Sequence, residues 1–265
     1  MLAAVLGSPT RRNAKPVTSL LRTPTSLGND PWIRVARELR IRVSQPAFGN
    51  ALTELSEWFW DGCLEESCDA SGAALLRSPL AKANFEALAM LDTSGRHGRS
   101  AAVEMLEGGT LDAIHAKVLR EAIDSRPELY RVEHTSCGER RQLMDLESGK
   151  LLLVDPDAWP VKLVPGNLIV GRLIGVDEDA RWIGPVYPFP AGTPEEVLLD
   201  VRQGLADLAR AHPIARAAAT ERFLVDLHHQ WFFHVLVPAH GLSSRLAEDA
   251  PKAFTLLAGR MRTSG

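Results

Sequence analysis

The stretch LYRVEHTSCGERRQLMDLESGKLLLVD, residues 129–155, decides the fold class of this chain. Upstream of it the apolar residues recur with helical spacing, whereas within it they form short runs that turn residues separate. Such runs are typical of β-strands joined by tight turns. We expect three strands, over residues 129–134, 141–146 and 150–154, with turns around Cys137-Gly138 and at Ser148-Gly149.

Two more strands are expected after this stretch, over residues 168–176 and 181–186. A tight turn at Pro165-Gly166-Asn167 precedes the first of them, and an acidic turn over residues 177–179 separates the two. Five short strands in succession are typical of a small antiparallel barrel. Barrel closure also removes the unpaired edges that so short a sheet would otherwise expose.

Helices are expected before the barrel. The first begins at Pro31, which suits an initial helical turn, behind the N-cap candidate Asp30. A second covers residues 50–62, and short helices follow within residues 72–130. Thr110 is the candidate N-cap of the last of these.

Helices return after the barrel. Thr193 is an N-cap candidate, followed by Pro194 and two acids that suit the first turn of a helix. Two further helices are expected over residues 214–236 and 244–262, the second interrupted by Pro251. The chain is therefore predicted to be an α+β protein in four parts. These are a flexible basic arm (1–30), a helical region (31–128), a small five-stranded antiparallel β-barrel (129–190) and a C-terminal helical region (191–265).

Several motifs in and before the barrel resemble those of a family of largely uncharacterised bacterial proteins, some of which carry a SecA-tail-type zinc motif. The matching segments are Trp58-Phe59-Trp60-Asp61, Ser125 to Val132, Asp145-Leu146-Glu147-Ser148-Gly149, Pro165-Gly166-Asn167-Leu168 and Arg172-Leu173. The resemblance implies a helical region that leads into a small barrel. The zinc tail is absent here, because no cysteine follows Cys137. The shared motifs form turns, so the resemblance implies no active site.

The charge of the chain is unevenly distributed, although its net value is only −3. Residues 1–50 hold eight Lys and Arg against two acids, whereas residues 51–130 hold seven against fourteen. A basic segment of this kind indicates either an anionic partner or pairing with the acidic block that follows it. The sequence leaves both interpretations open.

The predicted partner-binding residues lie on the first helix and on the barrel. They are Arg34, Arg37, Arg40, Arg42, Tyr130, Arg172 and Trp182. Nucleic-acid binding requires an excess of basic residues beside exposed aromatic rings. Residues 131–190 contain nine acids, so the barrel is not basic. A protein partner is therefore favoured, and a nucleic acid is considered only for the basic N-terminal region.

The segment LHHQWFFHVLVPAH, residues 227–240, is the strongest candidate for chemistry. On a helix, two metal-binding histidines need a spacing of three or four residues, and none of these histidines has it. We therefore expect a buried amphipathic helix that packs through Trp231, Phe232, Phe233 and Leu236. The alternative is a metal-dependent hydrolase that uses His228, His229, His234, Asp226 and Glu221.

Other classes of function find little support. Cys63 and Cys68 lack the second ligand pair of a zinc site, and the chain contains neither of the two common glycine-rich phosphate-binding motifs. The basic residues near the N-terminus follow its apolar run, the reverse of a secretory signal, and no apolar stretch is long enough for a membrane span. We expect a cytoplasmic, non-enzymatic binding or regulatory module without a metal, a cofactor or a membrane partner.

Overall fold

The computed structural model describes residues 31–61, 63, 78–95, 98–133, 141–154, 164–175, 180–212 and 215–239. The predicted arm, the cap at Asp30, the turns at 137–138 and 177–179 and the helix over 244–262 lie outside these residues. The α+β class is confirmed, because helices both precede and follow, along the chain, a curled five-stranded antiparallel sheet. None of the described helices has the length and apolar character that crossing a membrane requires.

The helices before the sheet follow the predicted segments closely. They are α1 (Pro31–Val43), the short 3-10 helix η2 (Pro46–Phe48), α2 (Gly49–Phe59), α4 (Pro79–Leu91), α5 (Ala101–Glu107) and α6 (Ala113–Asp124). The predicted cap of the last helix is wrong. Asp112, and not Thr110, caps α6, because its Oδ1 accepts hydrogen bonds from the backbone N–H groups of Ile114 and His115.

Five strands form the sheet, in the spatial order β3-β2-β1-β4-β5. They are β1 (Glu128–Val132), β2 (Arg141–Asp145), β3 (Leu151–Val154), β4 (Leu168–Ile174) and β5 (Arg181–Phe189). Strands β1 to β4 form a Greek key, because β4 returns to lie beside β1. A parallel bridge between Val154 and Ala180 brings the two edges of the sheet together at one point. The five strands therefore form a curled, partly open Greek-key half-barrel.

The tight turn before β4 forms as predicted. Gly166 adopts a φ of +86°, which favours glycine, and its N–H donates to the carbonyl of Val132. The Asn167 side chain closes the turn by accepting from the N–H of Val164 at 2.9 Å. The turn therefore fixes the position of β4 beside β1.

Strand β5 extends three residues beyond its predicted end at residue 186. Pro185 and Pro188 argue against a strand in the sequence, but prolines are tolerated at a sheet edge. Helices satisfy the outer backbone groups of this edge. The buried Asn84 of α4 exchanges two 2.9 Å hydrogen bonds with the backbone of Val186, and the indole of Trp231 donates to the carbonyl of Pro188.

After the sheet come α7 (Glu195–Arg210) and α8 (Arg216–Trp231), which continues through the π-helix η7 (Phe232–Leu236) into α9 (Val237–Ala239). The predicted cap at Thr193 is wrong, because its hydroxyl donates to the carbonyl of Pro190 and α7 begins without a side-chain cap. The two acids predicted for the first turn of α7 are found there.

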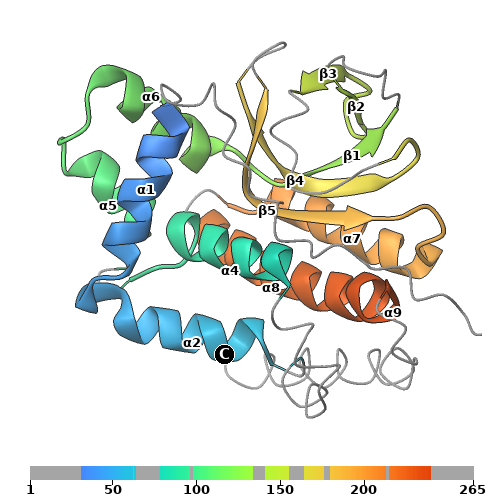
Figure 1. The fold of residues 1–265 in the computed structure, drawn as a ribbon, viewed down its shortest axis with the longest axis horizontal. Coiled ribbons are helices and arrows are strands. Elements are labelled where there is room, and N and C mark those ends of the chain that lie inside the picture. The colour runs from blue at the N-terminus through green and yellow to red at the C-terminus, as the bar shows by residue number, and fades with distance from the viewer. Residues whose placement is uncertain are drawn as a thin grey trace, which may run out of the picture.

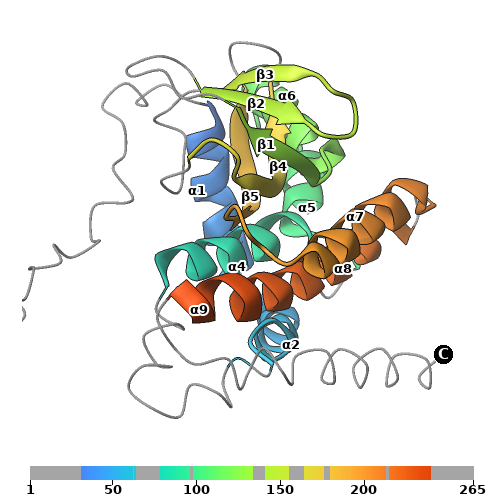
Figure 2. The same cartoon turned by 90° about the vertical axis from the view of Figure 1, so that its right-hand side faces the viewer.

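The molecule is layered, with the sheet above α4 and α8 and with α2 below them (Figure 1). Helices α1, α5 and α6 pack together at one end, around Val35, Leu39 and Leu119. The view in Figure 2 shows α7 beside α8, under the β1–β2 end of the sheet. The largest buried cluster lies between the layers and includes Phe59 of α2 and Tyr187 of β5.

Candidate partner-binding site

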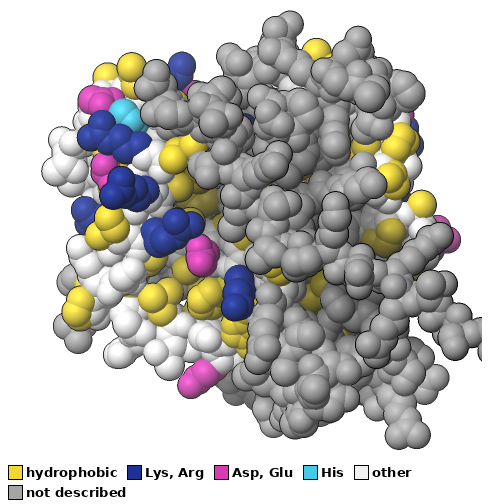
Figure 3. Space-filling model, viewed as in Figure 1, with side chains coloured by type: hydrophobic (Ala, Val, Ile, Leu, Met, Phe, Trp, Pro, Cys, Tyr) yellow, Lys and Arg dark blue, Asp and Glu magenta, His cyan; other side chains and the backbone are white. Residues whose placement is uncertain are grey.

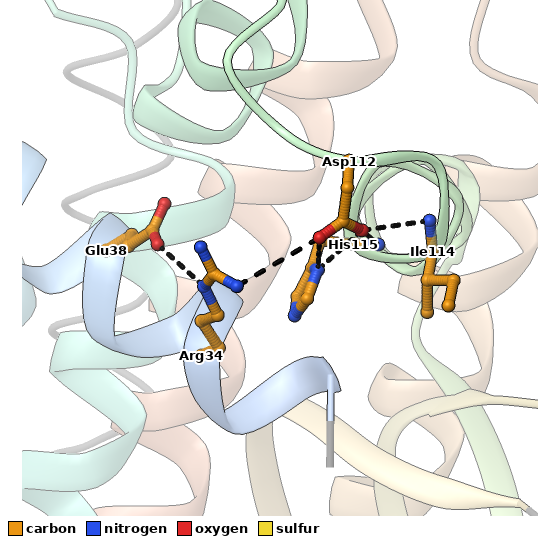
Figure 4. A network of polar contacts seen from close by, with 5 residues as sticks. All are labelled: Arg34, Glu38, Asp112, Ile114 and His115. Carbon is orange, nitrogen blue, oxygen red and sulfur yellow. Dashed lines mark hydrogen bonds and ion pairs between the residues drawn. The ribbon is translucent and has the colours of Figure 1, made fainter. Parts of the chain in front are cut away.

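Three of the four predicted arginines of helix α1 contact acids of neighbouring helices. Arg34 contacts Glu38 of its own helix at 3.2 Å and Asp112 of α6 at 4.0 Å (Figure 4). Asp112 also contacts the Nδ1 atom of His115 at 2.7 Å. Hydrogen bonds from the backbone N–H and then the imidazole of His115 lower the pKa of the Asp112 carboxyl.

The other three arginines differ in their partners. Arg40 contacts Glu86 of α4 at 3.0 Å, and Arg42 contacts Glu104 of α5 at 3.8 Å. Arg37 is exposed and forms no ion pair with any residue that the structure describes. Figure 3 shows Lys and Arg side chains gathered over the α1 side of the molecule, with single acids between them. We call Arg34, Arg37, Arg40 and Arg42 the arginine face.

This arrangement combines the two interpretations that the sequence left open. Three of the four arginines pair with the acidic block, as the second interpretation requires. The side chains of Arg34 and Arg40 nevertheless remain 63% and 62% exposed, so their guanidinium groups are accessible to another molecule.

The three barrel residues predicted to contact a partner are buried. The Tyr130 hydroxyl donates to Glu128 at 2.8 Å, and its ring meets Trp182 edge to face at a centroid distance of 5.5 Å. Arg172 is 2% exposed and binds Asp92 of the α4 C-terminus at 2.6 Å. These side chains hold the barrel together and attach it to α4, so none of them is available to a partner in this structure.

The residues of the alternative hydrolase face different neighbours. Glu221 lies beside Thr93, and burial raises its pKa. Burial also raises the pKa of Asp226 to about 6, against the opposing charge of Arg222. His234 lies near the acids of the α7 N-terminus, and burial lowers its pKa.

His228 and His229 lie where the C-terminal ends of α2 and α8 meet. The Nε2 atom of His229 is 3.1 Å from the backbone carbonyl of Phe59. His228 is completely buried, and its ring stacks on Phe59 at 3.7 Å and meets Trp60 edge to face at 5.4 Å. Neither ring nitrogen of His228 has a hydrogen-bond partner among the described residues, and burial lowers its pKa well below 6.5.

As expected from the sequence, Trp231, Phe232 and Leu236 are buried around this junction, and Phe233 is partly buried. Within the described ranges, no group of three or more His, Cys, Asp or Glu side chains is arranged to hold a metal ion. The hydrolase therefore remains a prediction for which these contacts offer no support.

A cleft that the sequence did not predict lies between α7 and the end of the β1–β2 hairpin. Its volume is about 240 Å³. Apolar side chains line its floor, and they are those of Pro127, Leu129, Leu146, Leu205, Ala206, Leu208 and Ala209. Charged side chains line its rim, and they are those of Arg126, Glu128, Glu147 and Arg202. Of the two leucines that α7 contributes, Leu208 is buried and Leu205 stays only partly covered.

Comparisons with known proteins assign no family to this chain. No family model, no curated protein and no solved structure matches it. The resemblance to bacterial proteins with a helical region and a small barrel therefore remains a prediction. The α+β fold with its half-barrel sheet does not by itself assign a function, because one fold supports many.

Proposed function

We propose that this protein is a non-enzymatic binding module that contacts an acidic segment of a protein partner through the arginine face of α1. The observation that carries the proposal is the set of exposed guanidinium groups on one helix. Arg37 has no acidic partner among the described residues, and Arg34 and Arg40 are more than half exposed.

The ion pairs that the arginine face already makes are weak enough for other carboxylates to replace them. Exposed ion pairs contribute about 0 to 1 kcal/mol each, because water and salt screen them. Glu86 and Asp112 are both about half exposed, at 51% and 54%. Carboxylates of a partner could therefore take their places at Arg40 and Arg34 at little cost.

The same acids favour a protein over a nucleic acid. A nucleic acid presents a continuous row of phosphates and binds faces on which positive charge is not interrupted. Here Glu38, Glu86 and Asp112 lie among the arginines and would repel such a row. A protein surface can place its charges to match a face of mixed sign.

A charge-reversal pull-down tests the proposal. The test variant carries Arg34→Glu, Arg37→Glu and Arg40→Glu, and the control carries Arg210→Glu, Arg216→Glu and Arg222→Glu on α7 and α8. All six arginines are exposed. We expect proteins that the unmodified chain and the control retain, in nuclease-treated extract, to be lost from the test variant.

Two outcomes contradict the proposal. If the test variant recovers every partner as well as the unmodified chain does, the arginine face is not the contact surface. Recovery that nuclease treatment abolishes identifies a nucleic acid as the partner instead. Circular dichroism of each variant establishes that the charge reversals leave the fold intact.

A further inference from the structure

We propose that the cleft between α7 and the β1–β2 hairpin binds an apolar side chain of a peptide in which an acidic residue lies next to that side chain. The inference rests on the proposed protein-binding function, but it uses a surface that does not include the arginine face. Three properties of the cleft carry it: its apolar floor, its size and the unequal pairing of charge on its two walls.

The floor of the cleft is apolar and incompletely covered. Leu129 and Leu208 are buried beneath it, while Leu146 and Leu205 are only partly covered. Ala206 is small and exposed, so α7 leaves open space above these leucines. An apolar group that enters would gain about 25 cal/mol for each Å² of apolar surface removed from water.

The size of the cleft indicates the kind of occupant. Pockets for cofactors and drug-sized ligands have volumes of roughly 300–1,000 Å³. The volume here is about 240 Å³, which suits a single large side chain better than a whole cofactor. Buried side-chain anchors of this kind are the usual energetic centre of a protein interface.

The charges on the barrel wall are already paired. Arg126 contacts Glu128 at 3.4 Å and Glu147 at 3.9 Å. Glu128 also accepts a hydrogen bond from the Tyr130 hydroxyl at 2.8 Å. One arginine against two glutamates leaves this wall with one net negative charge, so an acidic group of the occupant must lie on the opposite, α7 wall.

The α7 wall carries a positive charge, that of Arg202. Arg202 is exposed at the rim and forms no ion pair with a described residue. A carboxylate beside the inserted side chain would complement this guanidinium, and carboxylates pair with arginine through two parallel hydrogen bonds. The α7 side of the cleft thus favours an acidic neighbour for the apolar anchor.

The backbone N–H groups at the cleft are already hydrogen-bonded, so a peptide cannot bind there as an added strand. The N–H of Leu146 donates to the carbonyl of Leu129 at 2.9 Å, and the N–H of Glu147 donates to Asp145 at 2.9 Å. Peptides that add a strand need unpaired backbone groups at a sheet edge. The occupant is therefore recognised through its side chains.

Selection from a phage-displayed library of random heptapeptides tests the inference, with the full chain as bait. The most enriched sequence is then synthesised with a fluorophore, and its Kd is measured by fluorescence polarisation. We expect enrichment of peptides that carry a large apolar residue next to Asp or Glu. Ala206→Trp fills the cleft and should weaken binding of the synthetic peptide by about tenfold or more.

A second variant reads the charge preference directly. Arg202→Glu should change the selected neighbour from an acidic to a basic residue, which a merely structural role of Arg202 would not produce. The matched controls are Ala218→Trp and Arg216→Glu, exposed positions on α8 outside the cleft. Both controls should bind the peptide as the unmodified chain does.

The outcomes separate this inference from the proposed function. Absence of enrichment, or a peptide that Ala206→Trp binds with unchanged Kd, overturns the cleft proposal. A peptide that is lost on Arg34→Glu, Arg37→Glu and Arg40→Glu but kept on Ala206→Trp also overturns it, while supporting the arginine face. A peptide lost only on the cleft variant supports the cleft, even if the arginine-face pull-down fails.

Discussion

Two arginine–aspartate contacts in this molecule use the same chemical groups in opposite surroundings. Arg172 of β4 and Asp92 at the end of α4 are 2.6 Å apart, with side chains 2% and 8% exposed. Arg34 of α1 and Asp112 at the start of α6 are 4.0 Å apart, with side chains 63% and 54% exposed. Burial, and not residue type, decides how much each contact contributes to the free energy of unfolding.

The buried contact is the one on which the assembly of the fold depends. It joins the helical layer to the sheet, and burial raises the pKa of Asp92 while the guanidinium of Arg172 opposes that rise. The Oδ2 atom of Asp92 and the Nε atom of Arg172 have no hydrogen-bond partner among the described residues. Removing either side chain therefore leaves a charge in a medium that solvates it poorly. The exposed contact loses little when broken, because water replaces the lost partner.

The largest effect is expected from Asp92→Asn. The change removes the counter-charge of the buried Arg172 with little change in volume, and breaking a buried pair costs about 3–5 kcal/mol. Urea denaturation at pH 7 measures the loss in the free energy of unfolding.

A double variant sharpens this result. Asp92→Leu with Arg172→Met removes both charges and should recover most of the stability lost in the single variant, since apolar groups of similar size often replace a buried pair without loss. A loss below about 1 kcal/mol in Asp92→Asn would show that the buried pair behaves like the exposed ones.

A smaller effect, which depends on pH, is expected from His228→Phe. Burial lowers the pKa of His228 well below 6.5, so below that pH the unfolded chain binds a proton that the folded chain does not. The free energy of unfolding should therefore fall as the pH decreases from about 6.5 toward 5. The phenylalanine variant should show a slope shallower by up to about 1.4 kcal/mol per pH unit.

Only the slope matters for this prediction, since the substitution also changes packing against Phe59 and Trp60. Urea titrations at several pH values between 5 and 8 give the slope of the free energy of unfolding against pH for the unmodified chain and for His228→Phe. Equal slopes would show that His228 accepts a proton without leaving its aromatic surroundings.

The smallest effect is expected from Glu86→Gln. The side chains of Glu86 and Arg40 are 51% and 62% exposed, so the change should cost less than about 1 kcal/mol. That small difference should also shrink in 1 M NaCl, because salt screens exposed charges. A loss comparable with that of Asp92→Asn would contradict the distinction between the two kinds of contact.

The fold could be predicted from the sequence where local chemistry decides it. Gly166 and Gly149 mark turns at which φ is positive, and short apolar runs between such turns indicate strands. The end of β5 was missed because Pro185 and Pro188 argue against a strand unless the neighbours along its edge are known. The cap of α6 was missed because Thr110 and Asp112 are both suitable residues, and only the position of the helix distinguishes them.

The candidate site was less predictable, since exposure depends on tertiary contacts. The helical spacing in α1 indicated the arginine face, but the same residue type in a strand gave no sign that Arg172 would be buried against Asp92, 80 positions away. The cleft was missed for a related reason. Its walls come from α7 and the β1–β2 hairpin, which are separated in sequence by three further strands, and no local pattern specifies the distance between them in space.

The contacts along the outer side of β5 have a consequence for self-association. A strand whose outward N–H and C=O groups are unpaired can recruit a strand from another molecule and so begin aggregation. Here the amide of Asn84 occupies the outward groups of Val186, and Trp231 occupies the carbonyl of Pro188, which has no N–H to offer. Over this length of β5 the sheet is closed to further growth by side chains of two helices, so chains that meet at high concentration cannot join there strand to strand.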